Sequence, residues 1–181
     1  MLRLASGSVT RAELLKQAGI EFIQESVEYD EDSIIASTPK NFVYQATHGK
    51  YEINRRTFGI EDYPLLVADT VVTSNGHILR KARCVDDARN ILMTQSGSVT
   101  SIITCMIYED VNKKIIDISS TDYIFEEFED KDLDRYLTSG EWRGKAGACM
   151  VEGFCKKYIK KVHGYESTAM GLNTHLLGAL L

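Results

Sequence analysis

The stretch that decides the fold is residues 65–72, which reads Leu-Leu-Val-Ala-Asp-Thr-Val-Val. Apolar, largely β-branched runs of this kind form strands that are buried on both faces. An ionised carboxylate in such a strand is costly unless it has a hydrogen-bonded or metal partner. Asp69 is therefore either held by backbone N–H groups at a strand end or used in a functional site.

Length, charge and hydropathy narrow the class of protein. The chain has 181 residues, which suits one domain or one domain with two lobes. Its net charge of -5 gives no indication of a nucleic-acid partner. No stretch is long and apolar enough to span a membrane, and the N-terminus carries no secretory signal pattern. We therefore expect a cytoplasmic protein with no membrane partner.

The cysteines and histidines do not indicate a metal centre. Cys84, Cys105, Cys149 and Cys155 form no C-x-x-C pair, and no histidine lies at a metal-ligand spacing from them. We expect four reduced, mostly packed thiols.

The N-terminal segment has the pattern of a strand, a small-residue loop and a helix. Residues 2–5 are apolar, Ser6-Gly7-Ser8 interrupts them, and apolar side chains then follow at helical spacing. Ser8 or Thr10 is expected to cap the helix. Free N–H groups of the first turn and the guanidinium of Arg11 suit a phosphate group. The alternative is a plain strand-to-helix turn with an exposed arginine.

Two further charged segments follow along the chain. Residues 25–32 hold five acidic residues, and most runs of this kind are solvated loops. Glu31 becomes a candidate Mg²⁺ ligand only if it folds beside Asp69. Thr38-Pro39 is a typical helix start, and Lys50 lies beside the apolar face of that helix. Its ammonium can emerge into a cleft or simply reach solvent.

A turn after the strand at 65–72 brings a lysine back toward Asp69. Ser74-Asn75-Gly76 is typical of a hairpin, and Ile78-Leu79 can return beside the preceding strand. We expect the hairpin to place Lys81 near Asp69, which would pair a cation with a carboxylate. The alternative is a surface ion pair without a function.

The remaining segments continue an α/β pattern. We expect a helix capped by Asp86 and ended by Ser96-Gly97, two long antiparallel strands at 99–108 and 115–125, a helix from Asp130 to Gly140, a loop over 142–147, a strand over 154–162 and an apolar helix over 172–181. No internal repeat or low-complexity linker interrupts the chain, so residues 1–181 are expected to form a single domain.

Several separated segments, in the same order, resemble the Maf family of nucleoside triphosphate pyrophosphatases. The opening residues 4–15 read Leu-Ala-Ser-Gly-Ser-Val-Thr-Arg-Ala-Glu-Leu-Leu and are similar to the family's Leu-Ala-Ser-x-Ser-x-x-Arg-x-x-Leu-Leu. Ala68-Asp69-Thr70 resembles the Ala-Asp-Thr motif. Ser96-Gly97 and the segment from Gly140-Glu141 to Lys145-Ala146-Gly147 resemble later signatures, and Glu152-Gly153 follows where many members have Gln-Gly.

The resemblance implies a fold, a reaction and a set of site residues. The fold would be α/β, with an elongated mixed β-sheet flanked by helices and two lobes around a central cleft. The substrate would be a nucleoside triphosphate, hydrolysed to the monophosphate and pyrophosphate with Mg²⁺ or Mn²⁺; a homodimer is left open. The catalytic residues would be Asp69, Glu31 and Lys81, with Glu31 and Asp69 as metal ligands. The substrate-binding residues would be Ser6, Ser8, Arg11, Lys50, Thr70, Lys145 and Glu152.

Base selectivity and two alternative functions stay open. Thr10 stands where the branch resembling dTTP/UTP pyrophosphatases usually has a second arginine. The glutamate at position 152 resembles the residue found in the branch acting on 7-methyl-GTP. Asp69-Thr70 nevertheless resembles the first branch. The chain departs from the family pattern at three other positions. Ala82 and Asn173 each stand where the family usually has a proline, and Gly144 stands where it usually has an aspartate. The alternatives are an inosine-triphosphate-type pyrophosphatase and a nucleotide-binding regulator of septum formation with little turnover.

Overall fold

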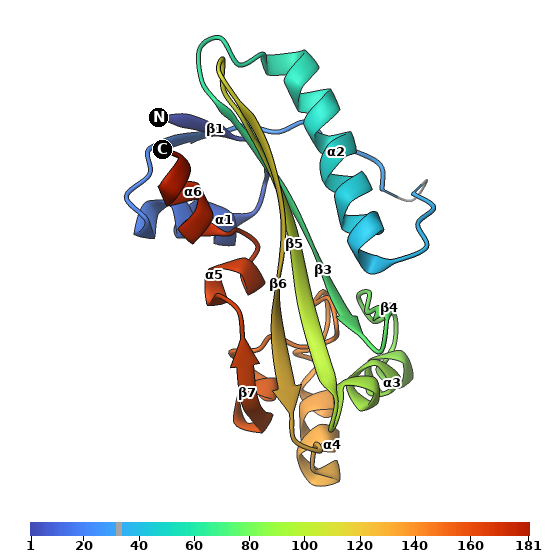
Figure 1. Cartoon of the computed structure of the whole chain (residues 1–181). Coiled ribbons are helices and arrows are strands. Elements are labelled where there is room, and N and C mark those ends of the chain that lie inside the picture. Colours follow the sequence, from blue (N-terminus) through green and yellow to red (C-terminus); the bar gives the residue numbers. More distant parts are fainter. Residues whose placement is uncertain (32–33) are drawn as a thin grey trace. The chain divides into compact units, whose positions relative to one another are not determined.

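The computed structural model describes residues 1–31 and 34–181 and contains a seven-stranded mixed sheet flanked by helices (Figure 1). The strands are β1 (Leu2–Leu4), β2 (Phe22–Gln24), β3 (Leu65–Ser74), β4 (His77–Ile78), β5 (Val99–Glu109), β6 (Lys114–Phe125) and β7 (Ile159–His163). The helices are α1 (Val9–Gln17), α2 (Pro39–Phe58), α3 (Val85–Gln95), α4 (Asp130–Ser139), the 3₁₀ helix η1 (Phe154–Tyr158), α5 (Glu166–Ala169) and α6 (Thr174–Leu180). Among the described residues, no helix has the length and apolar character needed to cross a membrane.

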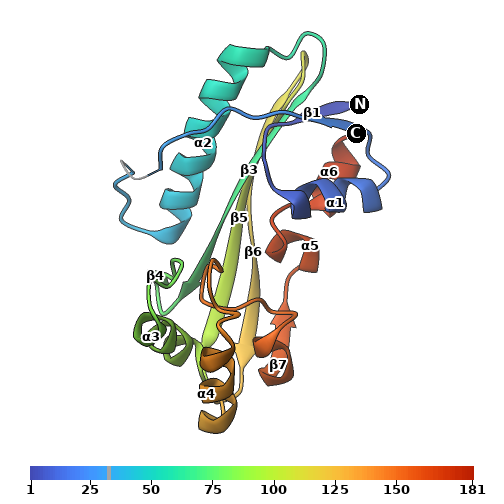
Figure 2. The same ribbon diagram turned by 180° about the vertical axis from the view of Figure 1, so that it is seen from behind.

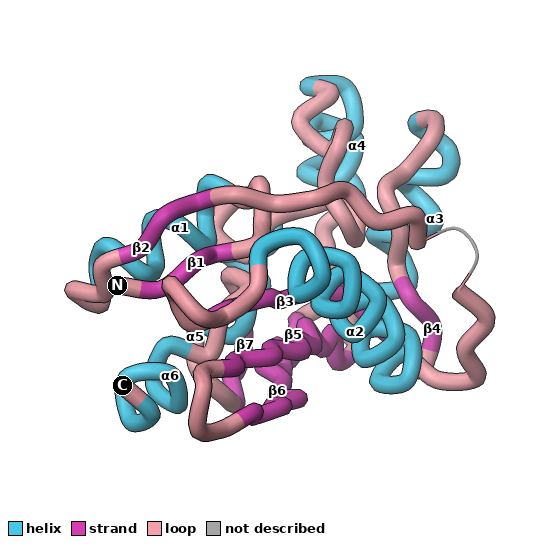
Figure 3. The backbone as a smooth tube through the Cα atoms, turned by 90° about the horizontal axis from the view of Figure 1, so that it is seen from above, coloured by secondary structure: helices cyan, strands magenta, loops and turns pink. Residues whose placement is uncertain are grey.

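The sheet has the strand order β2-β1-β3-β5-β6-β7, and β4 pairs with β3 off this path. β1 is parallel to both β2 and β3, and Figure 3 shows β1 and β2 side by side. β4 is antiparallel to β3, and β7 is antiparallel to β6. The Asp110 N–H donates to the Lys113 carbonyl at 2.9 Å and closes a tight turn between β5 and β6, a connection that only antiparallel neighbours allow. The predicted α/β fold with a mixed sheet is confirmed.

The chain divides into two compact units. The first unit holds Met1–Thr70, Ile103–Ser120 and Tyr165–Leu181, and the second holds Val71–Ile102 and Thr121–Gly164. β3, β5 and β6 each contribute residues to both units. The two predicted lobes correspond to these units, while the central cleft and the single-domain organisation stay predictions.

Within the first unit, β3 is buried on both faces, as its sequence predicts. Leu66 and Ala68 belong to a core cluster with residues of α1 and α6, whereas Leu65 and Val67 cluster with Tyr51 of α2. Figures 1 and 2 show α2 on one side of β3 and α1 with α6 on the other. Successive side chains of a strand point to opposite faces. The two residues that follow Ala68 therefore face different helices.

Local capping fixes where α1 and α2 begin. The Ser8 hydroxyl accepts the N–H of Arg11 at 3.3 Å, so Ser8 caps α1 and the alternative cap, Thr10, lies inside the helix. Thr38 caps α2 and Pro39 occupies its first position, which confirms the predicted helix start. α2 ends at Phe58.

In the second unit, the hairpin after β3 is confirmed and the expected cap of α3 is wrong. Asn75 and Gly76 have positive φ angles of 51° and 79°, as a tight hairpin turn requires. α3 begins at Val85, so Asp86 lies in the first turn instead of capping it. No side chain caps α3 at Cys84, and the Asp87 carboxylate accepts the N–H of Arg83, which precedes the helix, at 2.9 Å.

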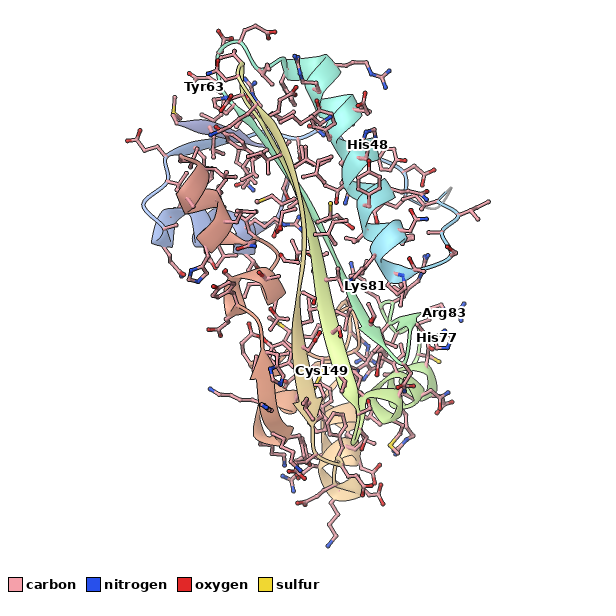
Figure 4. All side chains as sticks on the ribbon, viewed as in Figure 1. His48, Tyr63, His77, Lys81, Arg83 and Cys149 are labelled. Atoms are coloured by element: carbon pink, nitrogen blue, oxygen red, sulfur yellow. A yellow bond between two sulfur atoms is a disulfide. The ribbon has the colours of Figure 1, made fainter. Side chains whose placement is uncertain are left out.

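The expectation of four reduced thiols is wrong. Cys149 and Cys155 form a disulfide in the second unit, where Figure 4 labels Cys149. Turns over residues 147–153 reverse the chain and bring these two cysteines together, which no short cysteine motif in the sequence could signal. Cys84, which is exposed, and Cys105, which is buried, are free.

The strand expected over 154–162 is confirmed only in its second half, because η1 occupies its first half. The Phe154 ring stacks on Tyr136 with centroids 4.5 Å apart. The hydroxyl of Tyr158, which is buried, donates to Asp132 at 2.9 Å. These contacts with α4 hold the aromatic residues in a helical turn, and β7 starts only at Ile159.

Candidate active site

One lysine contacts the two carboxylates that the sequence singled out. Asp69 lies two residues after Val67 and shares its orientation toward α2. The Lys50 ammonium lies 2.6 Å from Asp69 Oδ1 and 2.5 Å from Glu31 Oε1. Glu31 therefore meets the condition set by the sequence, since it folds beside Asp69. Asp32, the last acidic residue of the same run, lies outside the described residues.

The Asp69 carboxyl is much less exposed to solvent than the Glu31 carboxyl beside it. Its side chain is 11% exposed, compared with 37% for that of Glu31. Burial raises the pKa of Asp69 above its ordinary value, and the nearby Lys50 ammonium opposes this rise. A carboxylate with a raised pKa is a better proton acceptor than an ordinary exposed aspartate.

The acidic segment before Glu31 is anchored on α2. The side chain of Asn54, which is buried, accepts the Val27 N–H at 2.9 Å. Tyr29 packs against Gly49 so closely that a Cβ at this glycine would overlap the tyrosine ring. Both contacts hold the segment along the helix and bring Glu31 to Lys50.

Arg11 is held on the other face of β3. Its Nε donates to the Gly171 carbonyl at 2.9 Å, and its two terminal nitrogens donate to Ser6 Oγ at 3.0 Å and Thr70 Oγ1 at 3.1 Å. A guanidinium has five N–H donors. Two of them have no acceptor in the part of the chain that the structure describes, which leaves them available to an anion.

The charge of Arg11 is maintained although its guanidinium is enclosed. Burial lowers its pKa, while Asp69 and Glu31 oppose this change. Since an arginine pKa starts far above neutrality, the group stays protonated. A half-buried cation with unused donors is suited to a phosphate oxygen.

The loop between β1 and α1 is ordered around the same arginine. Ser6 Oγ accepts the Ser8 N–H at 3.3 Å, and Gln24 donates to the Ser6 carbonyl at 2.7 Å. Because the first N–H groups of a helix have no acceptor within that helix, the start of α1 offers donors beside Arg11. The structure thus brings Ser6, Ser8 and Arg11 together, as the sequence predicts.

The second unit brings Lys81 and Lys145 to adjacent backbone segments. Lys81 forms an antiparallel bridge with Ala146, which follows Lys145 directly. The Gly147 N–H donates to the Leu79 carbonyl at 3.1 Å and extends this pairing. Figure 4 shows Lys81 on the segment after β4. The predicted pairing of Lys81 with Asp69 stays a prediction.

Glu152 lies in the loop that the disulfide closes. It is exposed, and the Gly153 N–H donates to the Met150 carbonyl at 3.0 Å in the adjoining turn. Its predicted contact with a nucleotide base stays a prediction.

Sequence reasoning missed the residues that hold the charged groups in place. Thr104 is fully buried and lies inside the apolar run at 102–107, which is the same signal that singled out Asp69. Asn54 is a buried amide within α2. Gly171 could not be found from the sequence because its role depends on a contact across 160 residues.

The chain is similar in sequence to known proteins over its whole length. A sequence model of the family described as Maf-like protein matches residues 1–181. The chain belongs to the Maf family.

Three relatives of this Maf chain are each named nucleoside triphosphate pyrophosphatase. The protein of a Nitratiruptor species is 53% identical over 182 residues, with 99% of this chain and 98% of the relative covered. The protein of Helicobacter pylori (strain J99 / ATCC 700824) is 36% identical over 180 residues, with 99% of this chain and 94% of the relative covered. The protein of Campylobacter jejuni subsp. jejuni serotype O:23/36 (strain 81-176) is 35% identical, with 100% of both chains covered.

The structure explains one departure from the Maf pattern. Asn173 stands where the family usually has a proline, and its Oδ1 accepts the Leu176 N–H at 3.1 Å to cap α6. Its amide nitrogen donates to Asp117 of β6 at 3.1 Å. Asn173 therefore starts the helix and ties it to the sheet, close in sequence to the Gly171 carbonyl that binds Arg11.

Proposed function

We propose that this protein is a nucleoside triphosphate pyrophosphatase that hydrolyses its substrate to the nucleoside monophosphate and pyrophosphate. The observation that carries the proposal is the convergence of Asp69 and Glu31 on the ammonium of Lys50. The catalytic names of three relatives favour turnover over nucleotide binding alone.

The cationic groups of the first unit serve to bind the triphosphate. The unused donors of Arg11 and the N–H groups at the start of α1 bind phosphate oxygens. The Lys50 ammonium adds a positive charge next to the carboxylates. Holding the phosphates against these groups lowers the barrier by positioning and by spreading the negative charge of the transition state.

Asp69 is suited to activate the attacking water. Burial raises the pKa of Asp69 and makes its carboxylate a stronger base, while Lys50 opposes this rise by stabilising the negative charge. Both effects are needed: burial makes Asp69 more basic, and Lys50 limits this change, because a protonated Asp69 could not accept a proton from water. Glu31 is more exposed and contributes charge beside it.

The donor set fits a hard divalent cation. Glu31 and Asp69 present only carboxylate oxygens, and Mg²⁺ is commonly held by one or two carboxylates together with phosphate oxygens and water. Among the described residues, no group of three His, Cys, Asp or Glu side chains forms a complete protein cage. When bound, Mg²⁺ or Mn²⁺ supplies neutralisation of phosphate charge. The cytoplasmic location and the homodimer stay predictions from the sequence.

Pyrophosphate release from a panel of ribo- and deoxyribonucleoside triphosphates tests the proposal. We expect release with at least one of them, and loss of release in Asp69→Asn, whose amide keeps the shape but loses the basicity of the carboxylate. Asp62→Asn is the matched control, because Asp62 is exposed in a turn of the same unit. Release at the wild-type rate from a folded Asp69→Asn variant contradicts the assignment.

A further inference from the structure

Two residues outside the predicted site are hydrogen-bonded to Arg11, Gly171 directly and Thr104 through Thr70. We propose that Thr104 of β5 and Gly171 are positioning residues that hold the Arg11 guanidinium with its unused donors directed to substrate phosphates. The inference rests on the proposed function and adds how its binding group is fixed.

A chain of hydroxyl groups links Arg11 to the backbone of α5. Thr104 Oγ1 lies 2.7 Å from the Thr168 carbonyl, which can only accept, so Thr104 donates its single proton there. Thr70 Oγ1 lies 2.9 Å from Thr104 Oγ1. Because the proton of Thr104 is used, Thr70 donates to Thr104 and keeps its lone pairs for Arg11. Thr104 therefore sets the direction of every bond in the chain.

This direction gives Thr70 a specific role. Its hydroxyl accepts from Arg11 at 3.1 Å and gives its only proton to Thr104. Thr70 then has no proton for a phosphate oxygen. Thr70, which the family resemblance places among the substrate-binding residues, then acts on the substrate through Arg11.

Gly171 holds the opposite side of the guanidinium. Its carbonyl accepts Arg11 Nε at 2.9 Å, and its φ of 109° is one that side-chain-bearing residues rarely adopt. A Cβ at this position would lie 3.2 Å from Arg11 Nε and 3.3 Å from Thr70 Oγ1, closer than ordinary contacts. A side chain at position 171 would strain the backbone and displace Arg11 or Thr70 by a few tenths of an ångström, so glycine favours this placement of the arginine.

The chain offers a matched pair of threonines for the test. Thr100 and Thr104 lie on β5 four residues apart, and both are almost completely buried. Thr100 Oγ1 has no hydrogen-bond partner among the described residues, in contrast to Thr104 Oγ1. Thr104→Val removes the relay with little change of shape, Thr104→Ser restores its hydroxyl, and Thr100→Val removes a buried hydroxyl that makes no bond.

Binding of inorganic tripolyphosphate, measured by calorimetry, is the first readout. We expect Thr104→Val to raise the Kd about tenfold, because a misaligned charged donor loses most of one hydrogen bond. In turnover, KM should rise more than kcat. Thr104→Ser and Thr100→Val should stay within about twofold of the wild type. Equal effects of Thr104→Val and Thr100→Val overturn the inference.

A spectroscopic readout separates this inference from the proposed function. The Arg11 Nε–H resonance, assigned by its loss in Arg11→Lys, reports the bond to Gly171 without any substrate. Thr104→Val should shift this resonance and speed its exchange with water, while Thr100→Val should leave it unchanged. An unchanged resonance in Thr104→Val overturns the positioning role. If the variants show the expected resonance changes but the wild-type protein hydrolyses no triphosphate, the proposed function alone is refuted.

A double-mutant cycle gives the final check. If Thr104 acts through Arg11, then Thr104→Val should add less than about twofold to the Kd in an Arg11→Ala background. A full tenfold addition in that background overturns the inference, because the hydroxyl would then act on the ligand by another route.

Discussion

Replacing Lys50 by methionine is expected to make stability strongly pH-dependent. The substitution keeps the apolar stem but removes the ammonium that contacts Asp69 and Glu31. Burial then raises the pKa of Asp69 further, since its main opposing charge is gone. Two neighbouring carboxylates are left without a compensating charge from this lysine.

The free energy of unfolding that Lys50→Met is expected to lose lies between two known limits. Exposed ion pairs contribute about 0–1 kcal/mol, and removing one partner of a fully buried pair costs about 3–5 kcal/mol. The Asp69 side chain is 11% exposed and the Glu31 side chain is 37% exposed, so the site lies between these cases. We expect Lys50→Met to lower the free energy of unfolding by about 2 kcal/mol at pH 8.

The sign of the pH dependence follows from the direction of the Asp69 shift. A carboxyl whose pKa is higher in the folded state than in the unfolded state binds protons more readily when folded. Its contribution is therefore fully present below the unfolded pKa and is lost as the pH rises through the folded pKa. The cost of Lys50→Met should be smaller near pH 5 than at pH 8.

Urea unfolding at pH 5 and pH 8 measures both values. Arg89→Met is the control, because it removes the pair between Arg89 and Asp134, whose side chains are 43% and 61% exposed. The control should cause a small loss that is the same at both pH values. An equal cost of Lys50→Met at pH 5 and pH 8 would refute the reasoning, since Asp69 would then not be the group that the lysine stabilises.

Three further predictions follow from the site and the disulfide loop. Replacing Cys149 and Cys155 by serine should lower stability by about 2 kcal/mol and the Tm by about 4–8 °C, given the sequence separation of 6; Cys84→Ser is the control, and an unchanged Tm of the double variant would count against a stabilising disulfide. Glu152→Gln should shift the kcat/KM ratio of guanine to uracil triphosphates toward uracil by about tenfold, since an ionised carboxylate only accepts hydrogen bonds; an unchanged ratio would leave Glu152 without a role in selectivity. Chelation should abolish turnover and added Mg²⁺ or Mn²⁺ should restore it, and full activity in chelator would exclude the carboxylate metal site.

Several elements of both units could be predicted because local rules determine them. The apolar run at 65–72 forms β3, Ser8 and Thr38 cap their helices, and Asn75-Gly76 forms the hairpin turn. In each case a short pattern is sufficient, since caps and tight turns depend on a few neighbouring residues. The site follows the same logic for Asp69, whose charge within an apolar strand is visible in the sequence alone.

The remaining features depend on contacts between distant residues. The Cys149–Cys155 disulfide depends on a chain reversal that has no cysteine motif, and η1 forms because aromatic residues pack on α4. The same holds for the clamp on Arg11, in which Gly171 and Thr104 come from segments far away in the sequence. Single-sequence patterns report periodicity and local propensity, and they do not report which distant polar groups will satisfy one another.

The most direct test of the proposed reaction is ³¹P NMR of the products formed from any nucleoside triphosphate that the protein consumes. The account predicts a nucleoside monophosphate and inorganic pyrophosphate as the first products in equal amounts, formed by the wild-type protein and not by Asp69→Asn. Formation of a nucleoside diphosphate with orthophosphate would contradict it, because cleavage would then occur at the β–γ bond instead of the α–β bond.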